Sequence, residues 1–426
     1  MTRRGVWDIQ DVRDKLLAGD PWERYNNVFT GGQSYFGSLG QNVETTPAPI
    51  AEVTKIPTTA DTRDFTSVRS LQKNKFAITS NNELFSWGYN VQGQLGQNTG
   101  YPPSYGGYKD KSVPVQIPGT TWDSVAGGPG RYGWFATKTD GTLWFTGGNN
   151  QLQQGTYPSS LVHRSSPIQV PGTSWAKNDG QAGQWKICTD EQAAFAIDTS
   201  GKLYAWGRND IGNLGLNQGS PTSYQITPND IGTDTTWQYV AASGYDSKSS
   251  TWAIKTDGTL WAWGCNDLVG PLGLNNTTSV SSPTQVGTDT TWSSISGGMG
   301  APWGNMAMAM KTDGSVWAWG RSDYGASGTN QYSFAYSSPR QVPGTWDMAV
   351  TSGTVSLLHK PDGTGWIVGD LNAANMSNPA GGNLMSSPVL LPSAVDWDKD
   401  KMDICSQFGS YVSLATISPN LTPTQV

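Results

Sequence analysis

Charged residues, histidine and cysteine are all scarce in this chain of 426 residues. Only 14% of the residues are Asp, Glu, Lys or Arg, and the formal net charge is −6 at pH 7. No cluster of lysine and arginine interrupts this acidic balance, which argues against nucleic acid as a partner. No run of 18 or more apolar residues occurs, so we expect no membrane insertion.

The residues that most often carry catalysis or bind metals are few and dispersed. The two histidines, His163 and His359, lie in different parts of the chain without a repeated partner. Cys188 and Cys405 occupy the same position of an internal repeat, where other copies carry alanine or serine, so packing explains them. The sequence therefore predicts no catalytic residue, no metal site and no cofactor, although a Ser-His-Asp triad assembled from separate repeats remains an alternative. We expect a protein that is not an enzyme.

Glycine and tryptophan, in contrast, are abundant, with 52 and 20 copies. The segment "KTDGTLWAWG" at 255–264 recurs as "KTDGSVWAWG" at 311–320. The glycine that ends this segment recurs seven times, at Gly32, Gly88, Gly147, Gly207, Gly264, Gly320 and Gly369. Successive copies lie 49 to 60 residues apart, and regular spacing of this kind is typical of repeat proteins in which each copy is one structural unit.

The repeated residues have the features of β-hairpins. Asp-Gly, as at Asp257-Gly258, suits the two central positions of a tight turn. In the "TLWAW" that follows, large and small side chains alternate as in a half-buried strand. The second tryptophan of this strand recurs at the same position of four repeats, as Trp87, Trp206, Trp263 and Trp319. This recurrence predicts a ring of wedges between packed sheets rather than a ligand cage.

The two ends of the chain hold complementary half-repeats. The first copy, from near Val28, has only a second half, and the last copy, 397–417, has only a first half. If the two halves share one sheet, no sheet edge stays open. We therefore expect an all-β fold, a seven-bladed β-propeller of four-stranded blades closed by N- and C-terminal strands in one blade. The propeller would span 26–418, after an N-terminal arm (1–25) and before a C-terminal tail (419–426).

These repeats resemble those of the regulator of chromosome condensation family, through "LWAWG", the glycine-rich tail after it and a later "SPxxV". The resemblance extends over nearly the whole of 26–418 and implies a seven-bladed propeller. It implies several functions, because one propeller serves unrelated roles. Members of the family exchange nucleotide on a small GTPase, inhibit a β-lactamase or form part of phage particles.

The arm at 1–25 predicts one short helix capped by Asp8 and ended by Gly19 and Pro21. Its "GVW…QDVRDKLL" is similar to the opening of structural proteins of marine tailed phages, including cyanophages. A helix this short needs a surface, either the propeller itself or a partner. The residues expected to contact a partner are Trp7, Ile9, Val12, Arg13, Leu16 and Leu17.

Between the two halves of each repeat the chain inserts a different loop. Tyrosine, serine, glycine and asparagine are common in these loops, as in adaptable binding loops. The candidate ligand contacts are Tyr101, Tyr105, Tyr108, Tyr157, Tyr332, Phe334 and Tyr336. The alternative is that these aromatic residues only cover the loops.

Together these features favour a non-enzymatic structural protein of a phage virion. The arm would anchor the propeller on a tail fibre, baseplate or head appendage. The propeller would bind other virion proteins or a glycan or protein of the host cell surface. The alternative is a protein–protein interaction propeller that acts as an exchange factor, an adaptor or an enzyme inhibitor.

Overall fold

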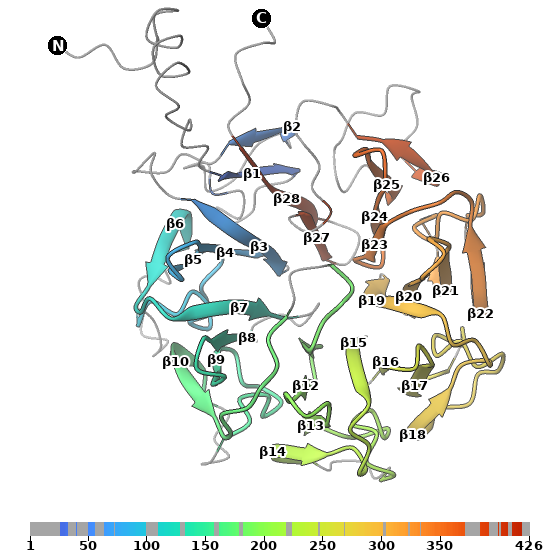
Figure 1. Ribbon diagram of the computed structural model, residues 1–426, viewed down its shortest axis with the longest axis horizontal. Coiled ribbons are helices and arrows are strands. Elements are labelled where there is room, and N and C mark those ends of the chain that lie inside the picture. Colours follow the sequence, from blue (N-terminus) through green and yellow to red (C-terminus); the bar gives the residue numbers. More distant parts are fainter. Residues whose placement is uncertain are drawn as a thin grey trace, which may run out of the picture.

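Four-stranded antiparallel sheets surround a common centre in the computed structural model (Figure 1). The structure describes residues 26–32, 40, 50–55, 64–71, 73–98, 110–127, 133–156, 162–178, 182–218, 224–245, 248–267, 269–300, 304–322, 324–332, 334–370, 384–391, 399, 402–407 and 411–419. Every regular element in these residues is a strand.

Six sheets each consist of four consecutive strands, and we number them as blades 1 to 6 along the chain. Blade 1 contains β3 (Phe65–Leu71), β4 (Asn74–Thr79), β5 (Leu84–Gly88) and β6 (Lys111–Ile117). Blade 2 contains β7 (Trp122–Ala126), β8 (Gly133–Lys138), β9 (Leu143–Gly147) and β10 (Arg164–Val170). Blade 3 contains β11 (Ile187–Thr189), β12 (Ala193–Ile197), β13 (Leu203–Arg208) and β14 (Tyr224–Asp230).

The later blades repeat this order. Blade 4 contains β15 (Trp237–Tyr245), β16 (Lys248–Lys255), β17 (Leu260–Gly264) and β18 (Val280–Gln285). Blade 5 contains β19 (Trp292–Gly300), β20 (Gly304–Lys311), β21 (Val316–Ser322) and β22 (Phe334–Val342). Blade 6 contains β23 (Met348–Thr351), β24 (Val355–His359), β25 (Gly365–Asp370) and β26 (Leu384–Leu390). The first strand of each blade lies near the centre and the fourth at the rim (Figure 1).

The remaining four-stranded sheet is composite, because it takes two strands from each end of the chain. Its order is β2 (Ile50–Lys55), β1 (Asn26–Gly32), β28 (Tyr411–Pro419) and β27 (Met402–Gln407). β1 and β28 pair in one continuous antiparallel register, from Asn26 opposite Pro419 to Gly32 opposite Ser413. The composite sheet lies between blade 1 and blade 6 (Figure 1), so the two ends of the chain close the ring.

The predicted fold class requires a correction at the N-terminus. It comprised seven blades and a helical arm, whereas the described residues form six blades of consecutive strands and one composite sheet, and no helix occurs in them. Residues 1–25, with the six candidate partner contacts of the arm, lie outside these residues. The described fold is therefore all-β, with six blades of consecutive strands and a composite sheet built from both ends.

The two tryptophans of each "WAW" strand face opposite sides of their blade. In β17, Trp261 is half-buried, whereas Trp263 is completely buried in a cluster with side chains of blade 3 such as Phe195. Trp263 Nε1 donates to Asn213 O of blade 3 at 3.0 Å. A Cβ on Gly215 would lie 2.8 Å from this indole nitrogen, so the glycine makes room for the ring. The indole thus fills the space between two blades.

The same wedge recurs at other blade junctions. Trp206 Nε1 donates to Gln153 O at 2.7 Å, and Trp319 Nε1 donates to Pro271 O at 2.9 Å. Trp87, Trp206, Trp263 and Trp319 all have no exposed surface. The prediction that these side chains are wedges between sheets is confirmed for the last three, whose partners lie in the preceding blade.

The aspartates of the "TDG" segments are turn residues, as predicted. Asp257 Oδ1 accepts hydrogen bonds from Thr259 N at 3.0 Å and from Thr259 Oγ1 at 2.7 Å. Equivalent bonds join Asp140 to Thr142, Asp313 to Ser315 and Asp362 to Thr364. These bonds from hydroxyl and backbone amide lower the pKa of Asp257, and they explain why an aspartate recurs at this turn.

We expect acid to weaken blade 4 through Asp234, which lies 2.6 Å from Lys255 Nζ. Burial raises the pKa of Asp234, but hydrogen bonds from Lys255 and Thr236 outweigh it and lower this pKa to about 2. A lowered pKa stabilises the fold above the unfolded value of 3.8, and this contribution is lost as pH falls toward 2. Asp234→Asn should lower the free energy of unfolding at pH 6 by about 0.5–1 kcal/mol. It should also flatten the decline between pH 4 and 2, measured by urea unfolding, and an unchanged slope would contradict this role.

An insertion in blade 3 reaches the inner strands of other blades. Residues 176–186 separate Trp175 from β11, whereas in blade 4 Trp237 itself begins the first strand. Ile295 N of β19 donates to Gly183 O, and Val240 N of β15 donates to Trp185 O, both at 2.8 Å. In Figure 1 the green chain after β10 runs from the rim toward the centre. The described part of the insertion therefore links blade 3 to the inner strands of blades 4 and 5.

Candidate functional site

The variable loops lie at one end of the blades because the strands alternate in direction. Connections between the first and second strands, and between the third and fourth, emerge on the same face. We call this the loop face. The Asp-Gly turns and the connections between successive blades emerge on the opposite face, which we call the turn face. The expectation that the inserted loops share one face follows from this topology.

In four blades a buried asparagine organises the start of the loop between the third and fourth strands. Asn266 follows β17, and its Oδ1 accepts a hydrogen bond from Leu272 N at 2.9 Å. Its Nδ2 donates to Asn276 O and Thr278 O, at 3.0 and 3.1 Å. Other blades repeat the first of these bonds: Asn90 with Leu95 N, Asn149 with Gln154 N and Asn209 with Leu214 N. The base of the loop is therefore fixed in these four blades, while the sequence beyond it varies.

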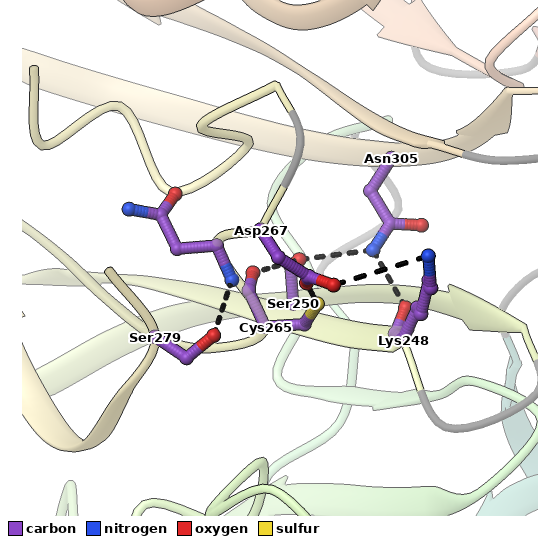
Figure 2. Close-up of polar contacts among 7 residues, drawn as sticks. Lys248, Ser250, Cys265, Asp267, Ser279 and Asn305 are labelled. Carbon is purple, nitrogen blue, oxygen red and sulfur yellow. Dashed lines mark hydrogen bonds and ion pairs between the residues drawn. The ribbon is translucent and has the colours of Figure 1, made fainter. Parts of the chain in front are cut away.

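Figure 2 shows a polar cluster where blades 4 and 5 meet on the loop face. Asn305 of β20 donates from Nδ2 to Lys248 O at 2.8 Å and to Ser250 Oγ at 2.9 Å. Ser250 Oγ donates in turn to Cys265 O at 2.7 Å. At the edge of the cluster, Lys248 Nζ lies 3.8 Å from Asp267 Oδ2. Buried amides and hydroxyls thus join the blades, beneath a more exposed ion pair.

A second buried contact joins blade 4 to blade 3. Ser249 Oγ donates to Asp190 Oδ2, while Asp190 Oδ1 accepts from the backbone N–H groups of Gln192 and Ala193 at 2.8 and 2.7 Å. Ser249 and Ser250 are neighbours in β16 and face opposite sides of the sheet. One strand therefore contacts the blades on both sides of it, through two adjacent serines.

The titratable groups of this cluster are poorly suited to nucleophilic catalysis. Burial, with the hydrogen bond to Asp267, raises the pKa of the Cys265 thiol to about 12. The nucleophile is the thiolate, which is nearly absent at neutral pH when the pKa is so high. Burial also raises the pKa of Asp190. In the described ranges, no three His, Cys, Asp or Glu side chains form a group that could hold a metal ion.

The two histidines do not meet. His359 Nδ1 lies 2.6 Å from Asp347 Oδ1, within blade 6. His163 Nδ1 accepts from Asn149 N at 3.2 Å in blade 2, and burial lowers its pKa. Each histidine supports local structure.

As to membranes, none of the segments described here is a helix with the length and apolarity needed to cross one.

The candidate ligand contacts have different environments. Tyr332 is 47% exposed, and its hydroxyl donates to Leu384 O at 2.7 Å. Tyr336 is half-buried and packs against the cluster between blades 4 and 5, which fits a covering role. Phe334 begins β22. Tyr101, Tyr105, Tyr108 and Tyr157 lie outside the described residues.

The sequence analysis did not identify the polar cluster of Lys248, Cys265, Asp267 and Asn305. A signal for part of it existed, because an asparagine follows "WG" by two positions in several repeats. That signal marks the base of the loop, however, and no single repeat reveals that Asn305 contacts the preceding blade.

Comparisons with known proteins agree with this architecture. The model of the regulator of chromosome condensation (RCC1) repeat matches residues 81–130 and 257–300. RUG3, a mitochondrial RCC1 domain-containing protein of Arabidopsis thaliana, is 27% identical over 246 residues, which cover 56% of this chain and 49% of that protein. The ultraviolet-B receptor UVR8 of the same plant is 27% identical over 312 residues, covering 71% of this chain and 63% of UVR8. The chain thus spans about half to two thirds of the length of these relatives.

Among solved structures, Prp20p from Saccharomyces cerevisiae superimposes with a TM-score of 0.71 at 15% identity. The match covers 94% of this chain and 93% of Prp20p, for which binding to Gsp1p and histones has been described. Identity this low supports the fold alone. Residues 81–130 and 257–300 are thus similar to RCC1 repeats, and the chain has a propeller fold similar to that of Prp20p.

Proposed function

We propose that this RCC1-repeat propeller is a non-enzymatic module that binds a protein partner through its loop face. The observation that carries the proposal is the contrast between constant and variable parts. Buried asparagines and serines fix the loop bases in successive blades, while the loops beyond them differ in length and sequence. A rigid scaffold that displays varied loops is the usual arrangement of a binding surface.

The polar cluster of blades 4 and 5 supports binding rather than chemistry. Its thiol has a raised pKa, and Cys265 is 5% exposed. Its charged members are accessible, since the side chains of Lys248 and Asp267 are 36% and 50% exposed. Prp20p, with a similar fold, binds proteins, and the present chain would do the same through residues of its own.

Affinity capture with matched variants tests this proposal. The variant Lys248→Ala/Asp267→Ala/Tyr332→Ala changes exposed side chains of the loop face, and Asp289→Asn changes the turn face. We expect the affinity of the loop-face variant for a captured partner to be about tenfold lower than that of the wild type, because a few exposed side chains dominate binding. Asp289→Asn should retain it as wild type does. Equal loss in both variants, or in neither, would argue against the loop face.

A second candidate function rests on the sequence of residues 1–17. Their similarity to the opening of marine phage structural proteins favours a virion protein, with the arm as the anchor and the propeller displayed on the particle. Other virion proteins, or a host surface glycan or protein, would then be the partners. Deleting residues 1–25 should release a folded propeller from purified particles, whereas continued incorporation would refute the anchor.

The two candidates differ in what they bind. Accelerated nucleotide exchange on a small GTPase would favour the first candidate in the form of an exchange factor. Copurification with particles, followed by a glycan array, would favour the second.

A further inference from the structure

Four blades hold a lysine between two tryptophans at the turn face. In blade 4, Lys255 Nζ lies 4.7 Å from the ring centroid of Trp237 and 4.0 Å from that of Trp261. Blades 2, 5 and 6 repeat the arrangement with Lys138, Lys311 and Lys360. An ammonium over an aromatic face is attracted by the ring quadrupole. We call each arrangement an aromatic clamp.

Blade 3 has the two rings of a clamp but no lysine between them. Aligned on the turn glycine, "KTDGTLW" at 255–261 corresponds to "DTSGKLY" at 198–204. Trp175 and Tyr204 supply the rings, with centroids 5.2 Å apart and an interplanar angle of 75°. The lysine position is Asp198. A carboxylate therefore stands where the other four clamps have their ammonium.

A cavity of about 270 Å³ opens at this place. Its lining includes Trp175, Tyr204, Asp198, Ser174, Pro171 and Pro228. The cavity thus combines two aromatic rings with one carboxylate. Among the described blades, only blade 3 carries an acid at the lysine position. Blade 1 also lacks the lysine, but it has Thr79 there.

The Asp198 carboxylate is oriented by its surroundings and has no cationic side chain bonded to it in the described structure. Oδ1 accepts from Ser200 N at 2.8 Å and from Lys202 N at 3.0 Å, and Oδ2 accepts from Tyr204 Oη at 3.2 Å. Burial raises the pKa of Asp198, but the hydrogen bonds outweigh it and lower this pKa, so the group is ionised. The nearby Lys202 ammonium pairs instead with Asp230 and lies 5.6 Å from the Tyr204 centroid.

We propose that this cavity binds the ammonium group of a lysine side chain from a partner protein, between Trp175 and Tyr204 and against Asp198. The four other clamps show that this scaffold holds such a group between two rings. The carboxylate adds a complementary charge. The site lies on the turn face, so it is separate from the loop face and goes beyond the function proposed above.

The probe is N-acetyl-lysine N-methylamide, followed through the indole N–H signal of Trp175 in ¹H–¹⁵N spectra. The signal is assigned with Trp175→Phe. We expect a saturable shift with a dissociation constant on the order of 1 mM, because one cation–π site and one partly exposed charge are worth only a few kcal/mol. N-acetyl-norleucine N-methylamide has a similar chain without the ammonium and should cause no saturable shift.

Three variants make the test specific. Asp198→Lys rebuilds the clamp of the other blades, so it should fold and lose binding of the probe. Asp198→Asn keeps the turn acceptor and removes the charge, which should weaken binding about tenfold. Asp257→Asn, at a turn of blade 4, should bind as wild type does. Equal binding by Asp198→Lys, or saturable binding of the norleucine probe, would overturn the proposal.

Discussion

Deletion of residues 411–426 is expected to abolish cooperative folding of the propeller. These residues include β28, which lies between β1 and β27 in the composite sheet. Without it, β1 loses a continuous register of seven residue pairs, and the edges of β1 and β27 are exposed. Because the stability of a whole domain is only about 5–15 kcal/mol, the loss of a central strand should remove most of it. Urea unfolding followed by tryptophan fluorescence measures this directly.

The matched control is deletion of 420–426, which leaves β28 intact and should preserve the wild-type transition. Adding a peptide of residues 411–419 to the larger deletion should restore part of the transition, since the missing strand is supplied in trans. A cooperative transition at the wild-type midpoint in the larger deletion would show that closure of the ring contributes little.

Trp263→Ala is expected to lower the free energy of unfolding by about 4 kcal/mol. Replacement of a buried tryptophan by alanine typically costs 3–5 kcal/mol, because the cavity adds to the lost transfer free energy. Trp263 is completely buried between blades 3 and 4. Its removal also takes the indole donor from Asn213 O.

Trp263→Val and Trp261→Ala are the controls. Blade 6 carries Val368 at the wedge position, so valine is already compatible with this fold, and Trp263→Val should destabilise less than alanine does. Trp261→Ala removes a half-buried clamp ring from the same strand and should cost roughly half as much. Equal effects of Trp261→Ala and Trp263→Ala would mean that the wedge has no special importance.

The repeat made much of this fold predictable. Asp-Gly at 257–258 is a turn that local chemistry fixes, and Trp263 alternates with Trp261 on a strand, so both outcomes follow from periodicity. The pairing of β1 with β28 followed from the two half-repeats at the ends. The helical arm did not follow from periodicity in this way, and no helix occurs in the described residues. A helix this short is stable only against a surface, and the sequence does not identify that surface.

The sites were harder to predict because they depend on departures from the repeat. In sequence, "DTSGKLYAWG" at 198–207 differs from the repeated segment at several positions at once, so Asp198 does not stand out. Only the rings of Trp175 and Tyr204 show that a carboxylate occupies the lysine position of a clamp. Asn305 reaches a neighbouring blade, and a contact of that kind has no signature within one repeat. The insertion at 176–186 adds length before β11, but its contacts with β15 and β19 depend on how the blades are arranged around the centre.

The composite sheet also bears on how the protein is made. β1 leaves the ribosome long before its partner β28, because all six blades of consecutive strands lie between them in the sequence. Until β28 has been synthesised, one edge of β1 remains unpaired. An unpaired strand edge favours association between nascent chains. Sequential blades can form meanwhile from local hairpins, but the final circle depends on the most distant pairing in the sequence, and such pairing is slow. Expression yield should therefore respond to chaperones that shield β1 and β2 until β28 has been synthesised.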